Sequence, residues 1–204
     1  MQIRIIGGSD AGISAALRAR EVNPEADICV YLADDFPNYS ICGLPFFLSG
    51  ETPDWHSLAH RTVFEGIEIR RSCPVQDIDV WQKTLTVRGP DGTTERVAYD
   101  RLVIGTGALP VRPQIEGLDI PGVHQLHSME DSFRVKEHLE RADAKSAVIV
   151  GSGFIGVEMA DALTHLGMKV TLVELGQVVF PSVDPEFGSL ILDRLRAHGV
   201  AVVA

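Results

Sequence analysis

The stretch from Ala147 to Glu174, AVIVGSGFIGVEMADALTHLGMKVTLVE, decides how this chain of 204 residues folds. It opens with a short apolar strand and continues with a turn of the form Gly-x-Gly-x-x-Gly. A helix then runs to Gly167, and a second strand ends at the acid Glu174. This order of elements predicts a β-turn-α-β unit that binds a dinucleotide.

Each glycine of this turn has a physical task. Gly151 allows the tight turn, Gly153 lets a pyrophosphate approach the backbone, and Gly156 lets the helix pack closely on the strand. The N-terminus of the helix then stabilises the phosphate charge. Glu174 can accept hydrogen bonds from a ribose diol and would repel a 2'-phosphate, so NADH is favoured over NADPH. The alternative is a glycine-rich turn that holds no ligand.

The N-terminal region carries a weaker copy of the pattern. Its middle glycine is replaced by Ser9, and the acid at the end of the second strand is replaced by Leu32. Asp34 or Asp35 is then the candidate for the ribose. The expected elements are a strand at Gln2 to Ile6, the turn Gly7-Gly8-Ser9-Asp10-Ala11-Gly12, a helix at Ile13 to Glu21 and a strand at Asp27 to Leu32.

The sequence between the two glycine turns predicts mostly strands. Three of them are antiparallel, because short polar or Gly-Pro turns separate them. A last buried strand is closed by Gly105-Thr106-Gly107. The segments are a helix around Ser57 to Phe64, strands at Ile67 to Arg70, Val75 to Val80, Thr84 to Arg88, Thr94 to Tyr99 and Arg101 to Ile104, and a helix near Asp131 to Arg141.

Composition excludes several classes of protein. The formal net charge of -10 argues against a nucleic-acid partner, because phosphate binding needs a basic face. No apolar run approaches the roughly 18 residues that cross a bilayer, and the N-terminus lacks the features of a secretory signal. The three cysteines have no paired spacing, which favours a reducing cytoplasm. His56 and His60 are four residues apart but lack a third ligand, so no metal site is expected.

The cysteine in Asn38 to Gly50, NYSICGLPFFLSG, raises a separate question. Cys42 is either a buried apolar filler or a thiol placed to react. Cys29 lies within an apolar strand, and Cys73 precedes a proline at a strand boundary, so both are expected to be passive.

With a turn at Cys42-Gly43-Leu44-Pro45, the stretch Gly105-Thr106-Gly107-Ala108 and the two glycine turns, the sequence resembles the flavoprotein pyridine nucleotide-disulfide oxidoreductases. The resemblance is to their single-cysteine branch, which contains coenzyme A-disulfide reductases, NADH-dependent persulfide reductases and NADH oxidases or peroxidases. It implies an α/β fold with two Rossmann-like units. A three-layer ββα FAD domain with an antiparallel meander would occupy residues 1–112, and an NAD domain, incomplete at its C-terminus, residues 113–204.

The resemblance also implies roles for individual residues. Cys42 becomes a redox-active thiolate, and Ser14 and Arg18 would contact the substrate. For two of these residues a structural role is the alternative. Phe154 beside the turn could simply pack against the protein, and Glu158 in the helix could be a solvated surface side chain. The residues implied for FAD are Gly7, Gly8, Ser9, Ala11, Gly12, Asp34, Val75, Thr106 and Gly107, and those for NAD are Gly151, Gly153, Phe154, Ile155, Gly156, Glu158 and Glu174.

The substrate follows from what the chain lacks. Phe47 occupies the position of a second redox cysteine, so the sulfur that reacts must come from a small disulfide or persulfide. Asp10 stands where oxidases and peroxidases usually carry a histidine. Coenzyme A is disfavoured as the carrier of this sulfur, because its phosphates need positive partners. Basic or polar positions that contact coenzyme A in the family are here Glu21, Asn38, Ile41 and Glu65. A homodimer is implied for the longer enzyme of which this chain would be the N-terminal portion. The alternatives are an NADH oxidase or peroxidase that cycles through a cysteine sulfenic acid, and an inactive nucleotide-binding fragment.

Overall fold

The computed structural model describes all 204 residues, which form two compact units. The first unit consists of residues Met1–Ser40 and His56–Pro113. The second consists of Ile41–Trp55 and Gln114–Ala204. The segment that carries Cys42 therefore belongs with the second unit, although it interrupts the first in sequence.

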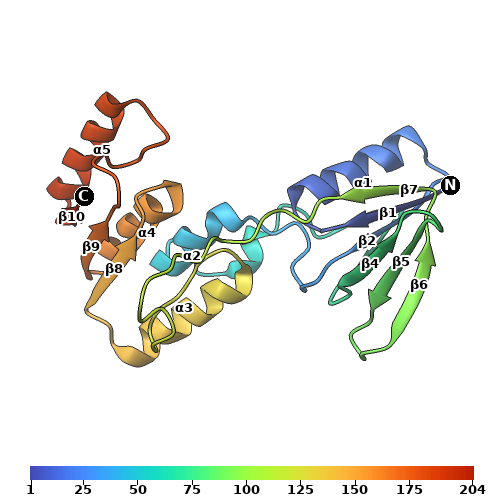
Figure 1. Ribbon diagram of the computed structural model, residues 1–204, viewed down its shortest axis with the longest axis horizontal. Coiled ribbons are helices and arrows are strands. Elements are labelled where there is room, and N and C mark those ends of the chain that lie inside the picture. The colour runs from blue at the N-terminus through green and yellow to red at the C-terminus, as the bar shows by residue number, and fades with distance from the viewer. The chain divides into compact units, whose positions relative to one another are not determined.

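A four-stranded parallel sheet forms the centre of the first unit. Helix α1 (Asp10–Val22) lies along one face of this sheet (Figure 1). Side chains from the helix and the strands, including Ile5, Ile13 and Val30, form a fully buried core between them. The strand order is β3 (Ile67–Arg70), β2 (Asp27–Tyr31), β1 (Gln2–Ile6) and β7 (Arg101–Ile104).

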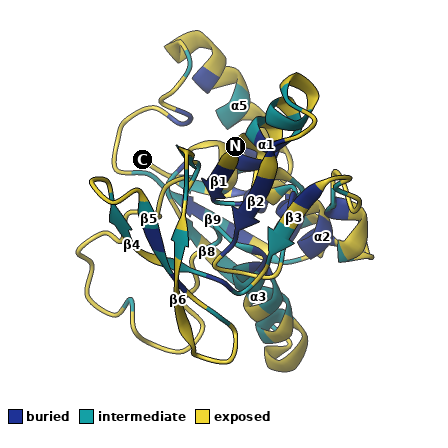
Figure 2. Ribbon diagram, turned by 90° about the vertical axis from the view of Figure 1, so that its right-hand side faces the viewer, coloured by how far each residue is buried: buried dark blue, intermediate teal, exposed yellow.

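An antiparallel meander covers the other face of this sheet. It is made of β4 (Val75–Asp79), β5 (Thr84–Arg88) and β6 (Thr94–Ala98). Leu85 and Val87 of the meander pack with Cys29 and Tyr31 of the sheet. Figure 2 shows β1 and β2 as the most deeply buried strands, as expected for strands between two layers. The three-layer ββα arrangement predicted from the sequence is therefore confirmed.

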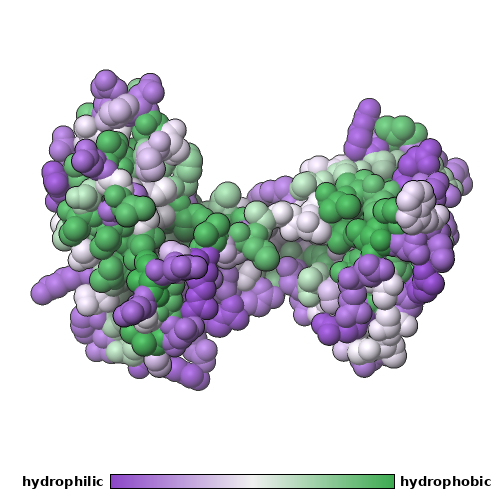
Figure 3. Space-filling model, viewed as in Figure 1, coloured by the Kyte–Doolittle hydropathy of each residue, from purple (hydrophilic) through white to green (hydrophobic).

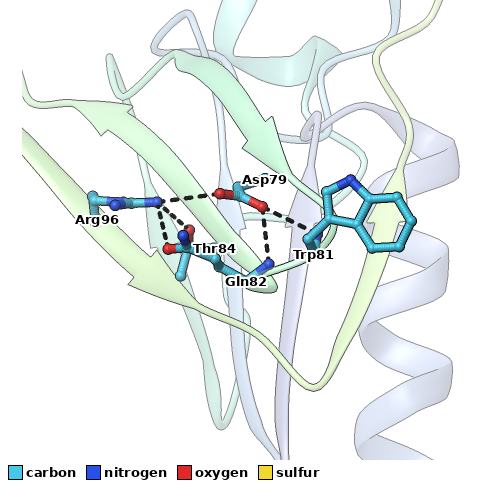
Figure 4. A network of polar contacts seen from close by, with 5 residues as sticks. All are labelled: Asp79, Trp81, Gln82, Thr84 and Arg96. Atoms are coloured by element: carbon cyan, nitrogen blue, oxygen red, sulfur yellow. Dashed lines mark hydrogen bonds and ion pairs between the residues drawn. The ribbon is translucent and has the colours of Figure 1, made fainter.

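A polar network fixes the turn between β4 and β5 (Figure 4). One oxygen of Asp79 accepts hydrogen bonds from the backbone N–H groups of Trp81 and Gln82, at 3.0 and 2.9 Å. Arg96 reaches across from β6 and donates to the side chains of Gln82 and Thr84, both at 3.1 Å. The turn is ordered by these bonds while its Trp81 side chain points outward, 92% exposed.

The second unit is built on a three-stranded parallel sheet of order β10-β9-β8. Helix α4 packs on β8 and β9, and α5 packs on β10. Apolar surface gathers over this unit in Figure 3, and Val148 and Val150 of β8 are 68% and 62% exposed. The elements are α2 (Leu44–Ser49), α3 (Met129–Ala142), β8 (Ser146–Val150), α4 (Phe154–His165), β9 (Lys169–Val173), α5 (Pro185–Ala197) and β10 (Ala201–Val203).

Three local expectations are wrong. The helix expected around Ser57 to Phe64 is only a 3-10 helix, η2 (Trp55–Leu58), because the backbone at Ala59 and His60 pairs with residues 38–39 instead. The turn expected at Gly43-Leu44-Pro45 is a 3-10 helix, η1 (Ile41–Gly43), that leads into α2 with Pro45 in its first turn. Helices α1 and α4 begin three residues earlier than expected. The sequence reading also missed α5 altogether.

No helix in the structure combines the length and the apolar character needed to cross a membrane.

Candidate functional site

The first glycine turn is closed by contacts that only glycine permits. Gly7 has a φ of +104°, which side chains rarely adopt, and its N–H donates to the carbonyl of Tyr31 at 2.9 Å. A Cβ on Gly12 would lie 1.9 Å from the Gly7 carbonyl oxygen, and one on Gly7 would lie 2.1 Å from that of Gly105. Substitution at either glycine would open the turn or push the end of β7 away.

The second glycine turn repeats this geometry. Gly151 has a φ of +101° and donates to the carbonyl of Val173 at 2.8 Å. A Cβ on Gly156 would lie 2.0 Å from the Gly151 carbonyl oxygen. By contrast, a Cβ on Gly153 would meet no protein atom within 4 Å, so the space in front of this glycine is open. This matches the task of the middle glycine, which is to let a pyrophosphate approach the backbone.

In both turns the N-terminus of the helix lacks a side-chain cap. The N-cap residues, Ser9 for α1 and Gly153 for α4, have extended backbones, and neither supplies a side-chain capping bond. The N–H groups of the first helical turn have no partner within a helix, and together with the helix dipole they favour a bound anion. The two turns therefore fit the diphosphates of FAD and NAD.

Glu174 follows β9 and folds back onto the second turn. Its Oε2 accepts from the backbone N–H of Ser152 at 2.8 Å and from the Ser152 hydroxyl at 2.6 Å, and its Oε1 accepts from the N–H of Gly176 at 3.0 Å. Hydrogen bonds from Gly176 and Ser152 stabilise the carboxylate and lower the pKa of Glu174 to about 2. The acid that the sequence singled out is therefore ionised and held beside the glycine turn.

The corresponding position in the first unit has no charge. Leu32 is buried under the turn, and a Cβ on Gly8 would lie 2.3 Å from the Leu32 side chain. The acids that follow, Asp34 and Asp35, are exposed. Asp34 accepts from the N–H of Phe36 at 2.9 Å, and Asp35 accepts from the Ser72 hydroxyl at 2.8 Å. The carboxylate of Asp34 therefore takes part in a local turn and stays at the surface.

The other residues expected at the flavin also lie in the first unit. The strand β7 leaves the sheet at Gly105, whose N–H donates to the Ile6 carbonyl at 2.7 Å beside the first turn. Thr106 and Gly107 follow and are exposed, and Gly107 has a φ of +67°. Val75 begins β4 and packs against the cluster between sheet and meander. Ala11 is exposed in the first turn of α1.

Cys42 is the exposed thiol of the chain, whereas Cys29 and Cys73 are 1% and 3% exposed. It lies in η1, directly before α2. The ring of Phe47 in α2 packs edge-to-face on Phe133 of α3, with ring centres 5.9 Å apart. The short apolar helix therefore anchors the segment while Cys42 stays accessible. Cys42 is therefore not a buried filler. Cys29 lies in the core, as its apolar strand predicts, and Cys73 is buried just before β4.

The aromatic and acidic candidates of the second unit lie at the start of α4. Phe154 is 62% exposed, and its ring packs edge-to-face on Phe180 with ring centres 4.6 Å apart. Ile155 is also exposed, at 52%, and Glu158 lies one turn further along on the surface. Phe154 therefore packs against the protein on one side of its ring only, and most of its surface is exposed.

The substrate candidates lie on α1 in the first unit. Ser14 is exposed. Arg18 is also exposed and forms an ion pair with Glu21 at 2.7 Å, one helical turn away. An acid at position 21 therefore partly neutralises the cation that a phosphate-bearing substrate would need.

Two groupings escaped the sequence reading. Asp10 accepts from the amide of Asn38 at 2.9 Å, and His60 lies 3.3 Å from the same carboxylate. These residues come from three separate segments, and the left-handed backbone of Asn38 (φ 57°) that joins them leaves no sequence signal. The other grouping is Ser152 with Phe180. The position of Ser152 between two glycines of the motif was the available hint.

Comparison with known proteins identifies the family. Residues 1–204 match the family described as pyridine nucleotide-disulphide oxidoreductase. The chain belongs to it. The NAD(P)H coenzyme A polysulfide/persulfide reductase of Pyrococcus horikoshii is 32% identical over 97% of this chain and 45% of its own length. The NADH oxidase of Methanocaldococcus jannaschii is 30% identical over 100% of this chain and 47% of its own.

A solved structure agrees with both. The NAD-dependent persulfide reductase from A. fulgidus superposes with a TM-score of 0.93 and 35% identity, over 100% of this chain and 39% of that one. The chain spans about half the length, or less, of these relatives. The predicted resemblance, the α/β fold of two Rossmann-like units and the oxidoreductase class are confirmed. FAD and NAD(H) are the cofactors that this membership indicates, in agreement with the residues that fit them.

Proposed function

We propose that the complete protein is an FAD-dependent oxidoreductase that uses NADH to reduce a small disulfide or persulfide through Cys42. The observation that carries this proposal is the contrast among the three cysteines. Only Cys42 is exposed. Burial raises the pKa of Cys29 to about 12, so that thiol cannot form a thiolate at neutral pH. Cys73 is buried as well.

The glycine turns divide the binding of the two cofactors between the units. The first turn, Asp34, Val75, Thr106 and Gly107 would hold FAD, and the second turn with Phe154, Ile155, Glu158 and Glu174 would hold NADH. When bound, this pair supplies two electrons as hydride. The protein's own part is to place the diphosphates on the N-termini of α1 and α4 and to select the dinucleotide through Glu174. Since Glu174 is ionised, it would repel a 2'-phosphate, which supports a preference for NADH.

The sulfur chemistry needs a single thiolate. The Cys42 thiolate attacks one sulfur of a disulfide, forms a mixed disulfide and releases one thiolate of the substrate. Two electrons and a proton then return Cys42 to the thiolate and release the second half as a thiol. With a persulfide, Cys42 takes the terminal sulfur, and the same two electrons release it as sulfide. Phe47 five positions on explains why no internal dithiol competes for the bound sulfur.

The carrier of the substrate sulfur is proposed only by class. Ser14 and Arg18 on the exposed side of α1 are its candidate contacts, and the pairing of Arg18 with Glu21 favours a carrier with less phosphate charge than coenzyme A. We also propose a homodimer for the complete protein, on the resemblance to the family. Sedimentation velocity of the complete protein tests that assembly.

The test of the proposal is Cys42→Ser in the complete protein. Disulfide and persulfide turnover should disappear, because serine has no useful anion at neutral pH, while FAD stays bound and NADH still reduces it. Incubation of the wild type with a disulfide should leave a mixed disulfide at Cys42, detected by mass spectrometry. Cys29→Ser and Cys73→Ser are the matched controls and should keep turnover, with some loss of stability. Loss of turnover in Cys73→Ser but not in Cys42→Ser would refute the assignment.

The similarity to an NADH oxidase favours a second candidate function, in which Cys42 cycles through a sulfenic acid. Oxygen consumption in the absence of any disulfide separates the two candidates. An inactive nucleotide-binding protein would purify without the absorbance of FAD and would consume neither oxygen nor disulfide.

A further inference from the structure

Ser152 lies inside the second glycine turn and is fully buried. Its hydroxyl makes two hydrogen bonds of opposite direction. It donates to Oε2 of Glu174 at 2.6 Å and accepts from the backbone N–H of Phe180 at 3.1 Å. A serine hydroxyl has one donor and two acceptor sites, so one small side chain satisfies both segments at once. Three parts of the chain, the turn, the end of β9 and the loop before α5, therefore meet at Ser152.

The first consequence concerns the freedom of Glu174. A glutamate on a strand end has three rotatable bonds and would otherwise swing away from a bulky or negative ligand. Here Oε2 is held by both the N–H and the hydroxyl of Ser152, and Oε1 by the N–H of Gly176. Hydrogen bonds to a carboxylate are stronger than those between neutral groups, so the side chain is fixed in one position. Its charge is fixed with it.

The second consequence concerns Phe180. Its backbone has a left-handed φ of 60°, which is uncommon for an aromatic residue, and its side chain is 8% exposed. The bond from its N–H to Ser152 holds this conformation in place. The ring of Phe180 then packs against Phe154 at the N-terminus of α4. Ser152 thus holds both Glu174 and the backbone of Phe180 beside the second glycine turn.

We propose that Ser152 is a positioning residue that makes the second unit discriminate between a free ribose 2'-hydroxyl and a 2'-phosphate. It does so by holding Glu174 so that the carboxylate cannot retreat from the added phosphate. This inference rests on the proposed use of NADH and goes beyond it, because it assigns the selectivity to a pair of residues rather than to the acid alone.

The first unit supplies an internal comparison. Gly8 occupies the position of Ser152, since each follows the first glycine, and Leu32 occupies the position of Glu174, since each follows the strand residue that pairs with that glycine. Where the acid is absent, the serine is absent too, and Leu32 fills the space that a Cβ on Gly8 would need. The hydroxyl and the carboxylate therefore occur as a pair in one unit and are both missing from the other.

The experiment measures binding without any redox reaction. Isothermal titration calorimetry on the complete protein would compare ADP-ribose with its 2'-phosphate for the wild type and for Ser152→Ala, Ser152→Cys and Glu174→Gln. The wild type should favour ADP-ribose. In Ser152→Ala the ratio of the affinity for ADP-ribose to that for its 2'-phosphate should fall about tenfold, the usual effect of removing one hydrogen bond to a charged group. Ser152→Cys keeps a side-chain donor at this position, although sulfur is larger than oxygen and donates more weakly, so it should lose part of the ratio and decides the case if the alanine variant does not fold.

Ser132→Ala is the matched control. Ser132 is an equally buried serine of the same unit, and its hydroxyl donates to the Met129 carbonyl in α3. This variant should lose stability but keep the ratio. If Glu174→Gln loses the ratio while both Ser152 variants keep it, the inference fails and the proposed function stands. If the wild type shows no preference, the proposed use of NADH fails first. If the wild type shows it and Glu174→Gln keeps it, the selectivity does not come from Glu174, so the inference fails while the use of NADH stands.

Discussion

Gly7 and Gly151 open two turns whose backbones are nearly the same. Their φ angles are +104° and +101°, each donates its N–H to the strand that follows the helix, and in each turn the last glycine lies where a Cβ would strike the carbonyl of the first. The helices that follow begin with the same extended N-cap conformation. The backbone of the phosphate-binding turn is therefore set twice by the same three constraints.

The two units differ in the side chains around this common backbone. Gly8 and Leu32 form an apolar contact in the first unit, whereas Ser152 and Glu174 form a charged hydrogen bond in the second. The middle position is Ser9 in one turn and Gly153 in the other. The difference indicates that the backbone supplies a general diphosphate site, and that the residue pair beside it decides how the ribose is treated.

The largest effect should come from the glycines that both turns share. Gly12→Ala and Gly156→Ala each place a methyl group about 2 Å from a carbonyl oxygen that cannot move without opening the turn. Each should cost about 3 kcal/mol or more of stability in its unit. Gly12→Ala should yield protein without FAD, while Gly156→Ala should keep FAD and lose the binding of ADP-ribose. Flavin absorbance after purification and calorimetry check this. Loss of both cofactors in either variant would contradict the independence of the two turns.

A smaller effect is expected at the middle glycine of the second turn. Gly153→Ala adds a methyl group to open space at an ordinary φ of -74°, so its effect on stability should stay within about 1 kcal/mol. Binding of ADP-ribose should nevertheless weaken by about tenfold or more, because the methyl group occupies the approach to the backbone. Thermal melting and calorimetry on the same sample separate the two quantities. Unchanged affinity would mean that the diphosphate does not lie against Gly153.

Both glycine turns were predictable from the sequence because their signals are local. The order of strand, glycines and helix identifies each unit within about thirty residues, and the Gly-x-x-x-x-Gly spacing of the first and last glycines indicates where backbone must approach backbone. The prediction of a helix at Ser57 to Phe64 is wrong because backbone groups of this segment pair with the distant residues 38–39 instead. Helix α2 is only six residues long and contains Pro45, which also fits a turn. Helix α5 was foreseeable, since Asp184 and Pro185 are typical of a helix start.

The candidate site was predictable as a set of residues but not as a set of contacts. The sequence picked out Glu174 for the ribose and Cys42 for sulfur chemistry. Beyond the position of Ser152 between two glycines, it did not indicate that Ser152 joins Glu174 to Phe180, since the left-handed backbone of Phe180 is a product of tertiary packing. Nor did it bring His60 to Asp10, because the connection runs through Asn38 on another loop.

The apolar pair of the first unit allows a double-mutant cycle. Gly8→Ala alone should cost about 1–3 kcal/mol, since its Cβ meets Leu32, which is buried and must repack. Leu32→Ala alone should cost about 2–5 kcal/mol as a buried cavity. Together they should cost less than the sum, because the new methyl group enters the vacated space. Urea unfolding of the complete protein gives the coupling. Strict additivity would mean that Gly8 is required for a reason other than Leu32.

The smallest expected effect is on the pH dependence of stability. It tests the contrast between Leu32, which carries no charge, and Glu174, which is ionised. The folded pKa of Glu174 is about 2, below the value of about 4.3 expected for an unfolded glutamate. Its stabilising contribution is therefore fully present above that unfolded value and is lost as the pH falls toward 2. Between pH 5 and pH 3 the wild type should lose more stability than Glu174→Gln, measured as the shift in the urea midpoint. Ser152→Ala removes one of the bonds that depress this pKa, so its loss should be intermediate. If Glu174→Gln loses as much as the wild type over this range, Glu174 is not held by the bonds to Ser152 and Gly176, and the contrast between the two turns is only one of sequence.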